Sequence, residues 1–192
     1  MKKIALYTGK GAYMVKDVED FFARHNFDYD RLHEIDIQQG KLKDYGIFII
    51  GGGAIYDILP ALGRKGIENI QKFVKSGGKY IGICAGAYIA PGLGLTKTQF
   101  KRGRGEKEVK INFPLCGEKI KLYYCNGPLI EKLSKDDLLI AVDSSGKIGI
   151  IRKEYGKGLV YLFCGHPEGN LYKRISAESL GSTLFLKKIL SN

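Results

Sequence analysis

Residues 79–88 read Lys-Tyr-Ile-Gly-Ile-Cys-Ala-Gly-Ala-Tyr. This stretch is the most informative for the fold, because its pattern predicts an apolar strand that runs directly into a helix. Cys84 stands at the junction, between Gly82 and Gly86. A side chain held on a sharp turn between a strand and a helix has strained backbone angles, so its neighbours must be small. The G-x-C-x-G spacing therefore predicts a nucleophile elbow, in which Cys84 projects from the edge of a sheet.

The helix expected to begin at Ala85 gives Cys84 a second property of a nucleophile. Backbone N–H groups and the helix dipole at a helix N-terminus favour a thiolate over a thiol. A buried structural cysteine beside packing glycines is the alternative interpretation, because short motifs also arise by chance. The choice between the two depends on a partner for Cys84 elsewhere in the chain.

Residues 159–168, Leu-Val-Tyr-Leu-Phe-Cys-Gly-His-Pro-Glu, supply that partner. The apolar run is typical of a buried strand, and His166 follows its carboxyl end. The carboxyl ends of parallel strands gather at one edge of an open sheet, so we expect His166 beside Cys84. Pro167 favours an extended residue before it, which lets Glu168 orient the imidazole. The two stretches together predict a nucleophile, a base and an orienting carboxylate.

Strand and helix patterns alternate along the first half of the chain, which favours a parallel sheet covered on both faces. Before the elbow strand, the pattern predicts strands over 4–8, 32–37 and 46–50 and helices over 14–25 and 67–76. After the elbow, it predicts antiparallel hairpins over 107–113 with 119–124, joined by a turn at 114–118, and over 138–143 with 147–151. The final strand then carries His166, and a helix over 176–190 closes the chain.

The glycines that follow the third strand, Gly51, Gly52 and Gly53, are candidates for the oxyanion side of the site. Glycine lets a backbone approach a ligand closely and point N–H groups at it. The N–H of Ala85 needs a second donor from a neighbouring loop to bind a developing negative charge, and these glycines could supply it. A plain tight turn is the alternative interpretation.

Several stretches together resemble a known family. They are 7–11 (Tyr-Thr-Gly-Lys-Gly), 51–53, 77–88, 123–128 (Tyr-Tyr-Cys-Asn-Gly-Pro) and 155–158 (Tyr-Gly-Lys-Gly) through 166–168. The chain resembles the class I glutamine amidotransferase superfamily, and within it the amidotransferase-like domain at the N-terminus of some biotin-protein ligases. The resemblance implies a single domain over residues 1–192, an α/β three-layer flavodoxin-like sandwich with a mostly parallel central sheet and added antiparallel hairpins.

The same resemblance implies that Cys84, His166 and Glu168 form a catalytic triad and that the loop of Asn126 closes over the pocket. Turn chemistry alone also explains the sequence around Asn126. One position departs from the family, because Tyr88 stands where glutamine amidotransferases of this class typically carry glutamine. Tyr88 either lines the pocket or packs on the sheet, and its presence argues against glutamine as the substrate.

Composition narrows the function further. A chain of 192 residues with 44% hydrophobic content suits one well-buried domain, and no apolar run is long enough to span a bilayer. No signal pattern follows Met1, so we expect a cytoplasmic protein that does not bind membranes. The formal net charge is +11, yet only residues 97–107 form a dense basic run, so we do not expect nucleic acid as a partner. That run could bind an acidic substrate or partner near the site.

The four cysteines should stay reduced in the cytoplasm, and they form no C-x-x-C pair for zinc. We expect no metal and no cofactor. Cys116 and Cys125 could face each other across a hairpin, although free packed thiols are the favoured interpretation. Cys164 lies inside the strand before His166, where it is most simply a core residue and otherwise a second candidate nucleophile.

Two classes of function fit these features. The first is a cysteine-dependent hydrolase or amidotransferase-like enzyme that acts on a C–N (amide) bond of a small molecule, with any ammonia acceptor or synthetase on another protein. The second is a non-catalytic ligand-binding or regulatory module that retains the fold. A protease or deglycase of the related superfamily fits less well, because residues 7–13 lack the acidic residue such enzymes usually carry there.

Overall fold

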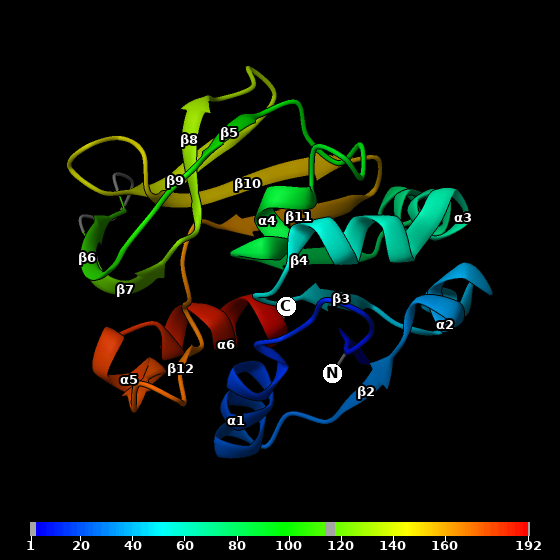
Figure 1. The fold of residues 1–192 in the computed structure, drawn as a ribbon, viewed down its shortest axis with the longest axis horizontal. Helices are drawn as coiled ribbons and strands as arrows, with labels where there is room; N and C mark the ends of the chain where they lie inside the picture. Colours follow the sequence, from blue (N-terminus) through cyan, green and yellow to red (C-terminus); the bar gives the residue numbers. More distant parts are fainter. Residues whose placement is uncertain (1–2, 114–117, 192) are drawn as a thin grey trace.

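The computed structural model describes residues 3–113 and 118–191 and centres on one mixed sheet (Figure 1). The strands of this sheet are β1 (Ile4–Tyr7), β2 (Tyr29–Leu32), β3 (Ile47–Ile50), β4 (Lys79–Ile83), β6 (Glu106–Asn112), β7 (Lys119–Cys125), β9 (Leu138–Val142), β10 (Gly149–Tyr155) and β11 (Gly158–Phe163). Their order across the sheet is β2-β1-β3-β4-β11-β10-β9-β6-β7.

The sheet has a parallel half and an antiparallel half. The strands from β2 to β11 pair in parallel, and the pairings from β11 to β7 are antiparallel. Strands β1, β3 and β4 are buried along their whole length, as expected where crossover helices cover both faces of a parallel sheet. The predicted α/β fold with antiparallel additions is confirmed, but the sheet is mixed rather than mostly parallel, since its parallel and antiparallel pairings are equal in number within the described ranges.

Helices cover both faces of this sheet. They are α1 (Val15–His25), α2 (Glu34–Gln38), the 3-10 helix η1 (Lys41–Asp44), α3 (Ile55–Lys75), α4 (Ala85–Ile89), α5 (Ala177–Leu180) and α6 (Thr183–Ser191). Figure 1 shows α3 and α4 on one side of β3 and β4, with α1 and α6 on the other, which gives three layers. A separate two-stranded ribbon, formed by β5 (Gln99–Arg102) and β8 (Pro128–Lys132), contacts α4.

The strand predicted over residues 32–37 is wrong in its position. Strand β2 ends at Leu32, and α2 occupies Glu34–Gln38. The Asp36 carboxylate accepts a hydrogen bond from the backbone N–H of His33 at 2.9 Å, and the two residues form a capping box. A capping box satisfies N–H groups at the start of a helix, so the alternating apolar residues here belong to a short helix rather than a strand.

Helix α3 begins twelve residues before the helix predicted over 67–76. Pro60 and Gly63 conceal its first half, because both residues disfavour a helix interior. The structure accommodates them with a kink at Gly63, whose φ of 58° and ψ of 179° lie outside the helical region. Both segments bury apolar side chains, Ile58 and Leu62 before the kink and Ile70 and Val74 after it.

The helix predicted over 176–190 is also interrupted. It forms as α5 and α6, separated by Gly181 and Ser182. Gly181 has a φ of 72°, a left-handed conformation that commonly ends a helix. Ser182 is fully buried and donates its hydroxyl to the carbonyl of Lys121 in β7. This tertiary contact fixes the break between the two helices.

The remaining predicted elements are confirmed. Helix α1 matches the helix predicted over 14–25, and both hairpins form, as β6 with β7 and as β9 with β10. The predicted turn at 114–118 and Cys116 fall largely outside the described residues, which resume at 118. Within the described ranges, none of the helices combines the length and the apolar character needed to cross a membrane.

Candidate functional site

Cys84 lies directly after β4 and has φ and ψ angles of 50° and −100°. Such a positive φ is strained for a residue other than glycine. The Cys84 N–H donates to the carbonyl of Phe163 at the end of β11, at 3.0 Å, and the Cys84 carbonyl accepts from the N–H of Tyr88 in α4, also at 3.0 Å. The strand and the helix therefore hold the strained residue from both sides, as a nucleophile elbow requires.

The two glycines that flank Cys84 are required by close packing. A Cβ atom at Gly82 would lie 2.6 Å from the backbone carbonyl of Gly86. A Cβ atom at Gly86 would lie 2.1 Å from the carbonyl oxygen of Ile50 in β3. Both distances are far below van der Waals contact. The G-x-C-x-G pattern is thus explained by the approach of α4 to the ends of β3 and β4.

His166 and Glu168 lie beside the elbow. Nδ1 of His166 and Oε1 of Glu168 are 2.9 Å apart, and both side chains are buried. The backbone N–H of His166 donates to the carbonyl of Tyr123 at 2.7 Å, which anchors the loop after β11 to β7. In the part of the chain that the structure describes, Nε2 of His166 has no hydrogen-bond partner. The imidazole therefore presents an unpaired nitrogen on the side away from Glu168.

The pKa of His166 reflects two opposing effects. Burial favours the neutral imidazole, but the Glu168 carboxylate and the Cys84 side chain outweigh it and hold the pKa of His166 well above its usual value. Because Cys84 acts on the pKa of His166, its side chain lies within electrostatic range of the imidazole ring. The sulfur of Cys84 and Nε2 of His166 nevertheless form no hydrogen bond. Sγ of Cys84 instead lies 3.7 Å from the carbonyl oxygen of Cys125.

The glycines after β3 also reach the site. A Cβ atom at Gly52 would lie 2.9 Å from Cε1 of His166, so the loop backbone packs directly against the imidazole. The carbonyl of Gly51 accepts from the N–H of Gly86 at 3.3 Å, and Gly53 packs against the backbone of Gly11. Ala85 is the first residue of α4, so its N–H group precedes the first hydrogen bond within the helix.

Tyr88 has a role that the two sequence interpretations did not include. Its hydroxyl donates to the carbonyl of Lys101 at 3.0 Å, accepts from the N–H of Gly103 at 3.0 Å and lies 3.4 Å from the carbonyl of Gly127. Its ring packs edge-on against Phe100. Burial raises the pKa of the Tyr88 hydroxyl, and the Gly103 hydrogen bond opposes that rise. Tyr88 therefore fastens the β5–β8 ribbon to the elbow helix.

Asn126 lies in the turn that faces Cys84. Its φ is 49°, its side-chain oxygen accepts from the N–H of Gly105 at 2.9 Å, and its own N–H donates to the carbonyl of Gly105 at 3.0 Å. The preceding carbonyl, of Cys125, is the one that Sγ of Cys84 approaches. The structure thus brings Asn126 next to the elbow, because the contact with Cys84 is made by the adjacent residue, Cys125.

The other two described cysteines differ from Cys84. Cys164 is fully buried, and burial raises the pKa of its thiol to about 12, so it is a core residue with little thiolate at neutral pH. Burial also raises the pKa of Cys125, with the Glu106 carboxylate adding to the effect. No disulfide links the described cysteines, which are free.

Sequence reasoning missed two groups near the site. Asp17 of α1 is buried, and its carboxylate accepts from the N–H of Leu171 at 2.7 Å and from Nδ2 of Asn170 at 3.3 Å. These contacts hold the loop that follows Glu168. A single acid on an amphipathic helix gives only a weak signal, because its partners lie more than 150 positions away. The second group is Glu106, whose carboxylate contributes to the raised pKa of Cys125.

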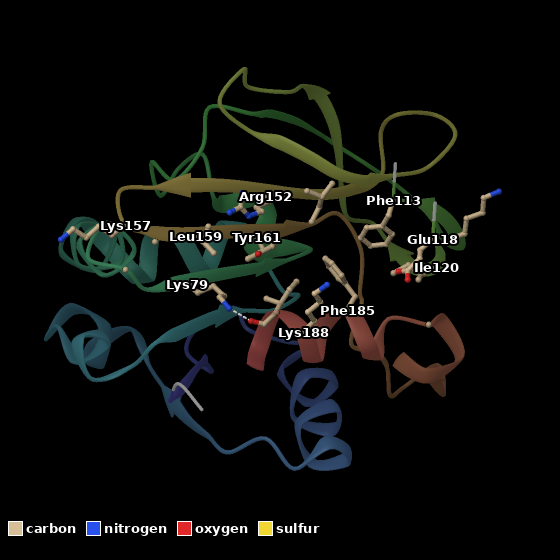
Figure 2. A pocket seen from close by; sticks show the side chains of 16 residues that line it. Lys79, Phe113, Glu118, Ile120, Arg152, Lys157, Leu159, Tyr161, Phe185 and Lys188 are labelled. Carbon is tan, nitrogen blue, oxygen red and sulfur yellow. Dashed lines mark hydrogen bonds between the residues drawn. The ribbon is translucent and has the colours of Figure 1, made fainter. Parts of the chain in front are cut away.

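A cavity among the described residues lies away from these groups (Figure 2). It has a volume of about 670 Å³ and lies between α6 and the antiparallel strands, with Arg152, Tyr161 and Phe185 in its wall. It is also lined by Lys79, the first residue of β4, whereas Cys84 follows the last residue of that strand. The described residues contain no group of three or more His, Cys, Asp or Glu side chains that could hold a metal ion.

Comparisons with solved structures agree with this fold. The chain superposes on a chain of PurLQS from Thermotoga maritima with a TM-score of 0.79 and 21% identity, over 100% of both chains. A glutamine amidotransferase crystal structure gives a TM-score of 0.70 and 18% identity, over 86% of this chain and 90% of the other. A cytoplasmic protein from Salmonella typhimurium LT2 gives 0.66 and 13%, over 98% of each chain. No curated protein sequence matches the chain.

A comparison with protein families is more specific. The model of the family described as "Biotin-protein ligase, N terminal" matches residues 37–116. The matched segment contains the glycines after β3 and the whole elbow, and it ends before His166. The chain thus matches the biotin-protein ligase N-terminal family over residues 37–116 and has the fold of the class I glutamine amidotransferase-like domains.

Proposed function

We propose that this protein is a cysteine-dependent hydrolase of the amidase or amidotransferase-like type, which acts on an amide C–N bond of a small molecule. The observation that carries the proposal is the strained Cys84 beside a buried His166–Glu168 pair. Backbone strain of this kind costs roughly 1–3 kcal/mol and clusters at functional sites. A purely structural cysteine requires neither the strain nor a buried imidazole of raised pKa.

The reaction follows from the roles of the three side chains. His166 accepts the Cys84 proton at Nε2, and the thiolate attacks the amide carbonyl. The N–H of Ala85 and the backbone of the Gly51–Gly53 loop bind the negative charge on the carbonyl oxygen. His166 then protonates the leaving amine, and a water molecule, deprotonated by His166, hydrolyses the thioester. Glu168 holds the imidazole tautomer and stabilises its charged form.

The substrate we propose is an amide other than glutamine. The Tyr88 hydroxyl is occupied by backbone groups of the β5–β8 ribbon, so it replaces the expected glutamine without offering an equivalent amide to a ligand. A site that lacks such polar contacts discriminates strongly against the substrate that needs them. We further propose that the chain works as a single cytoplasmic domain and that any ammonia-accepting synthetase is a separate protein.

A non-catalytic ligand-binding or regulatory module is the second candidate. The low exposure of the site favours it, since Cys84 is 8% exposed and His166 is 0% exposed. A substrate would need an opening of the loops over Cys84 before the thiol could attack. The experiment must therefore separate turnover from binding.

The test measures release of ammonia or amine from a panel of small amides that differ in charge and in chain length. The panel is run with wild type, Cys84→Ala and Cys164→Ala. The proposal expects release from at least one amide, lost in Cys84→Ala and retained in Cys164→Ala, because only Cys84 lies in the elbow. Equal release by the two variants would contradict the proposal. Absence of release across the panel would favour the binding module.

A further inference from the structure

Two arginines, Arg102 and Arg104, lie at the end of the β5–β8 ribbon where it meets the turn of Cys125 and Asn126. Arg102 is the last residue of β5 and pairs with Pro128, the first residue of β8. Arg104 follows two positions later, between Gly103 and Gly105. The loop that carries both arginines therefore faces the turn that contains Cys125 and Asn126.

The backbone of this loop is fixed to the candidate site by several hydrogen bonds. The N–H of Gly103 donates to the Tyr88 hydroxyl at 3.0 Å and to the carbonyl of Gly127 at 3.2 Å. Gly105 and Asn126 exchange two hydrogen bonds, of 2.9 and 3.0 Å. A Cβ atom at Gly103 would overlap the Tyr88-linked turn, since it would lie 2.6 Å from the carbonyl oxygen of Gly127. The loop therefore holds its two arginines at a defined place.

The guanidinium groups are exposed and unpaired. Neither Arg102 nor Arg104 forms an ion pair or a side-chain hydrogen bond with any residue of the described ranges. The neighbouring acid, Glu106, is occupied, because it contacts Lys173 at 3.2 Å and accepts from the Tyr123 hydroxyl at 3.2 Å. Two cations at this end of the ribbon thus have no counterion among residues 3–113 and 118–191.

Arg102 and Cys84 both act on the pKa of Tyr88, the residue that fastens the ribbon to α4. Burial and the Gly103 hydrogen bond act most strongly on the pKa of Tyr88; next, Cys84 raises this pKa and Arg102 lowers it. The Tyr88 hydroxyl therefore lies within electrostatic range of both groups. A molecule that contacts Cys84 from the ribbon side therefore comes near Arg102, and Arg104 follows two positions later on the same hydrogen-bonded segment.

The chemistry of arginine defines the kind of ligand. The guanidinium is planar, always charged, and presents N–H groups in a fork that matches carboxylate and phosphate oxygens. On the basis of the proposed function, we infer that Arg102 and Arg104 bind an anionic group of the substrate, a carboxylate or a phosphate, and so select anionic amides for reaction at Cys84.

The test compares two alkylating reagents of nearly equal size, anionic iodoacetate and neutral iodoacetamide. The rate of Cys84 alkylation by each is measured by peptide mass spectrometry at an ionic strength of about 0.1 M, where the Debye length is about 10 Å. Loss of both charges in Arg102→Gln/Arg104→Gln should lower the iodoacetate-to-iodoacetamide rate ratio roughly 3- to 10-fold, as expected for removing nearby charges in a solvated site. The ratio cancels any general change in the reactivity of the thiol.

A matched control removes two positive charges from the opposite end of the ribbon, where Lys132 pairs with Gln99. Lys132 is the last residue of β8, and Lys135 follows it in an exposed loop. Lys132→Gln/Lys135→Gln should leave the ratio near its wild-type value, because salt screens charges beyond about a Debye length. An unchanged ratio in the arginine variant, or an equal decrease in both variants, would overturn the inference.

A second measurement does not depend on a reactive thiol. The midpoint of thermal unfolding is followed with malonate or inorganic phosphate, using the same three proteins. A rise in wild type and in the lysine control that is absent from the arginine variant supports the inference, and the more effective anion identifies the group as carboxylate or phosphate. No rise with either anion counts against it. If Cys84 reacts with neither reagent, the proposed function fails, and this measurement alone then decides the anion site.

Discussion

At the scale of single residues, the proposed reaction depends on the buried His166–Glu168 pair beside Cys84. The raised pKa of His166 means that folding favours the charged imidazole. Its contribution to stability is then fully present below the unfolded-state pKa of about 6.5 and is lost as the pH rises through the higher folded-state value. We therefore expect the pH dependence of stability that arises from His166 to depend on the Glu168 carboxylate.

We predict that Glu168→Gln lowers the pKa of His166 and slows Cys84 alkylation by iodoacetamide at pH 7 about 10-fold, because the amide no longer supports the imidazolium. Imidazole NMR measures the first effect and mass spectrometry the second. The stability difference from wild type, from urea unfolding, should shrink as the pH rises above about 6.5. Glu178→Gln is the control, since Glu178 pairs with His25 instead. An unchanged His166 titration in Glu168→Gln would refute the role of Glu168.

The strained backbone of Cys84 leads to a second prediction about a single residue. Cys84→Ala keeps a side chain at a φ of 50°, whereas Cys84→Gly relieves the strain. Relief of roughly 1–3 kcal/mol exceeds the entropic cost of glycine, roughly 0.5–1 kcal/mol, so Cys84→Gly should be the more stable by about 1 kcal/mol. Urea unfolding measures the difference. Ala85→Gly, one residue into α4, should be destabilising, and a Cys84→Gly variant less stable than Cys84→Ala would contradict the strain argument.

At the scale of elements, Tyr88 joins the elbow helix to the β5–β8 ribbon. We predict that Tyr88→Phe destabilises the protein by about 1–2 kcal/mol, because the N–H of Gly103 loses a partner and only the carbonyl of Gly127 remains. Hydrogen exchange at the Gly103 amide should accelerate. Tyr172→Phe is a control of equal chemical change at a side chain 89% exposed. Similar stability losses in both variants would show that Tyr88 does not fasten the ribbon.

Some of these elements could be predicted from the sequence and others could not. The elbow and the His-Pro-Glu segment were predictable because local constraints define them, namely small residues at Gly82 and Gly86 and a proline that extends its neighbour. The break at Gly181 and the first half of α3 were not, since packing against distant strands overrides local preference there. Tyr88 escaped prediction for a related reason, because its partners lie on the ribbon, 13 to 39 positions away.

At the scale of the whole molecule, the mixed sheet explains where the site forms. The parallel half places the ends of β3, β4 and β11 at one edge, so the glycine loop, Cys84 and His166 meet there although Cys84 and His166 are 82 positions apart in the sequence. The end of β7, in the antiparallel half, and the separate β5–β8 ribbon also lie at that edge, where Cys125 and Asn126 face the elbow. The fold is that of glutamine amidotransferase-like domains. Tyr88 fastens the β5–β8 ribbon at this edge through its hydrogen bond to the carbonyl of Lys101.

This arrangement predicts that the isolated protein has negligible glutaminase activity. Free L-glutamine would enter a site in which Tyr88 replaces an amide side chain and its hydroxyl is already bonded to the ribbon, so the polar groups of the substrate would remain unpaired. Ammonia release from L-glutamine is measured with a coupled enzymatic assay, in wild type beside Cys84→Ala. The two proteins should give the same background rate. Ammonia release well above that background in wild type alone would show that glutamine is a substrate after all, because only a reaction at Cys84 distinguishes the pair.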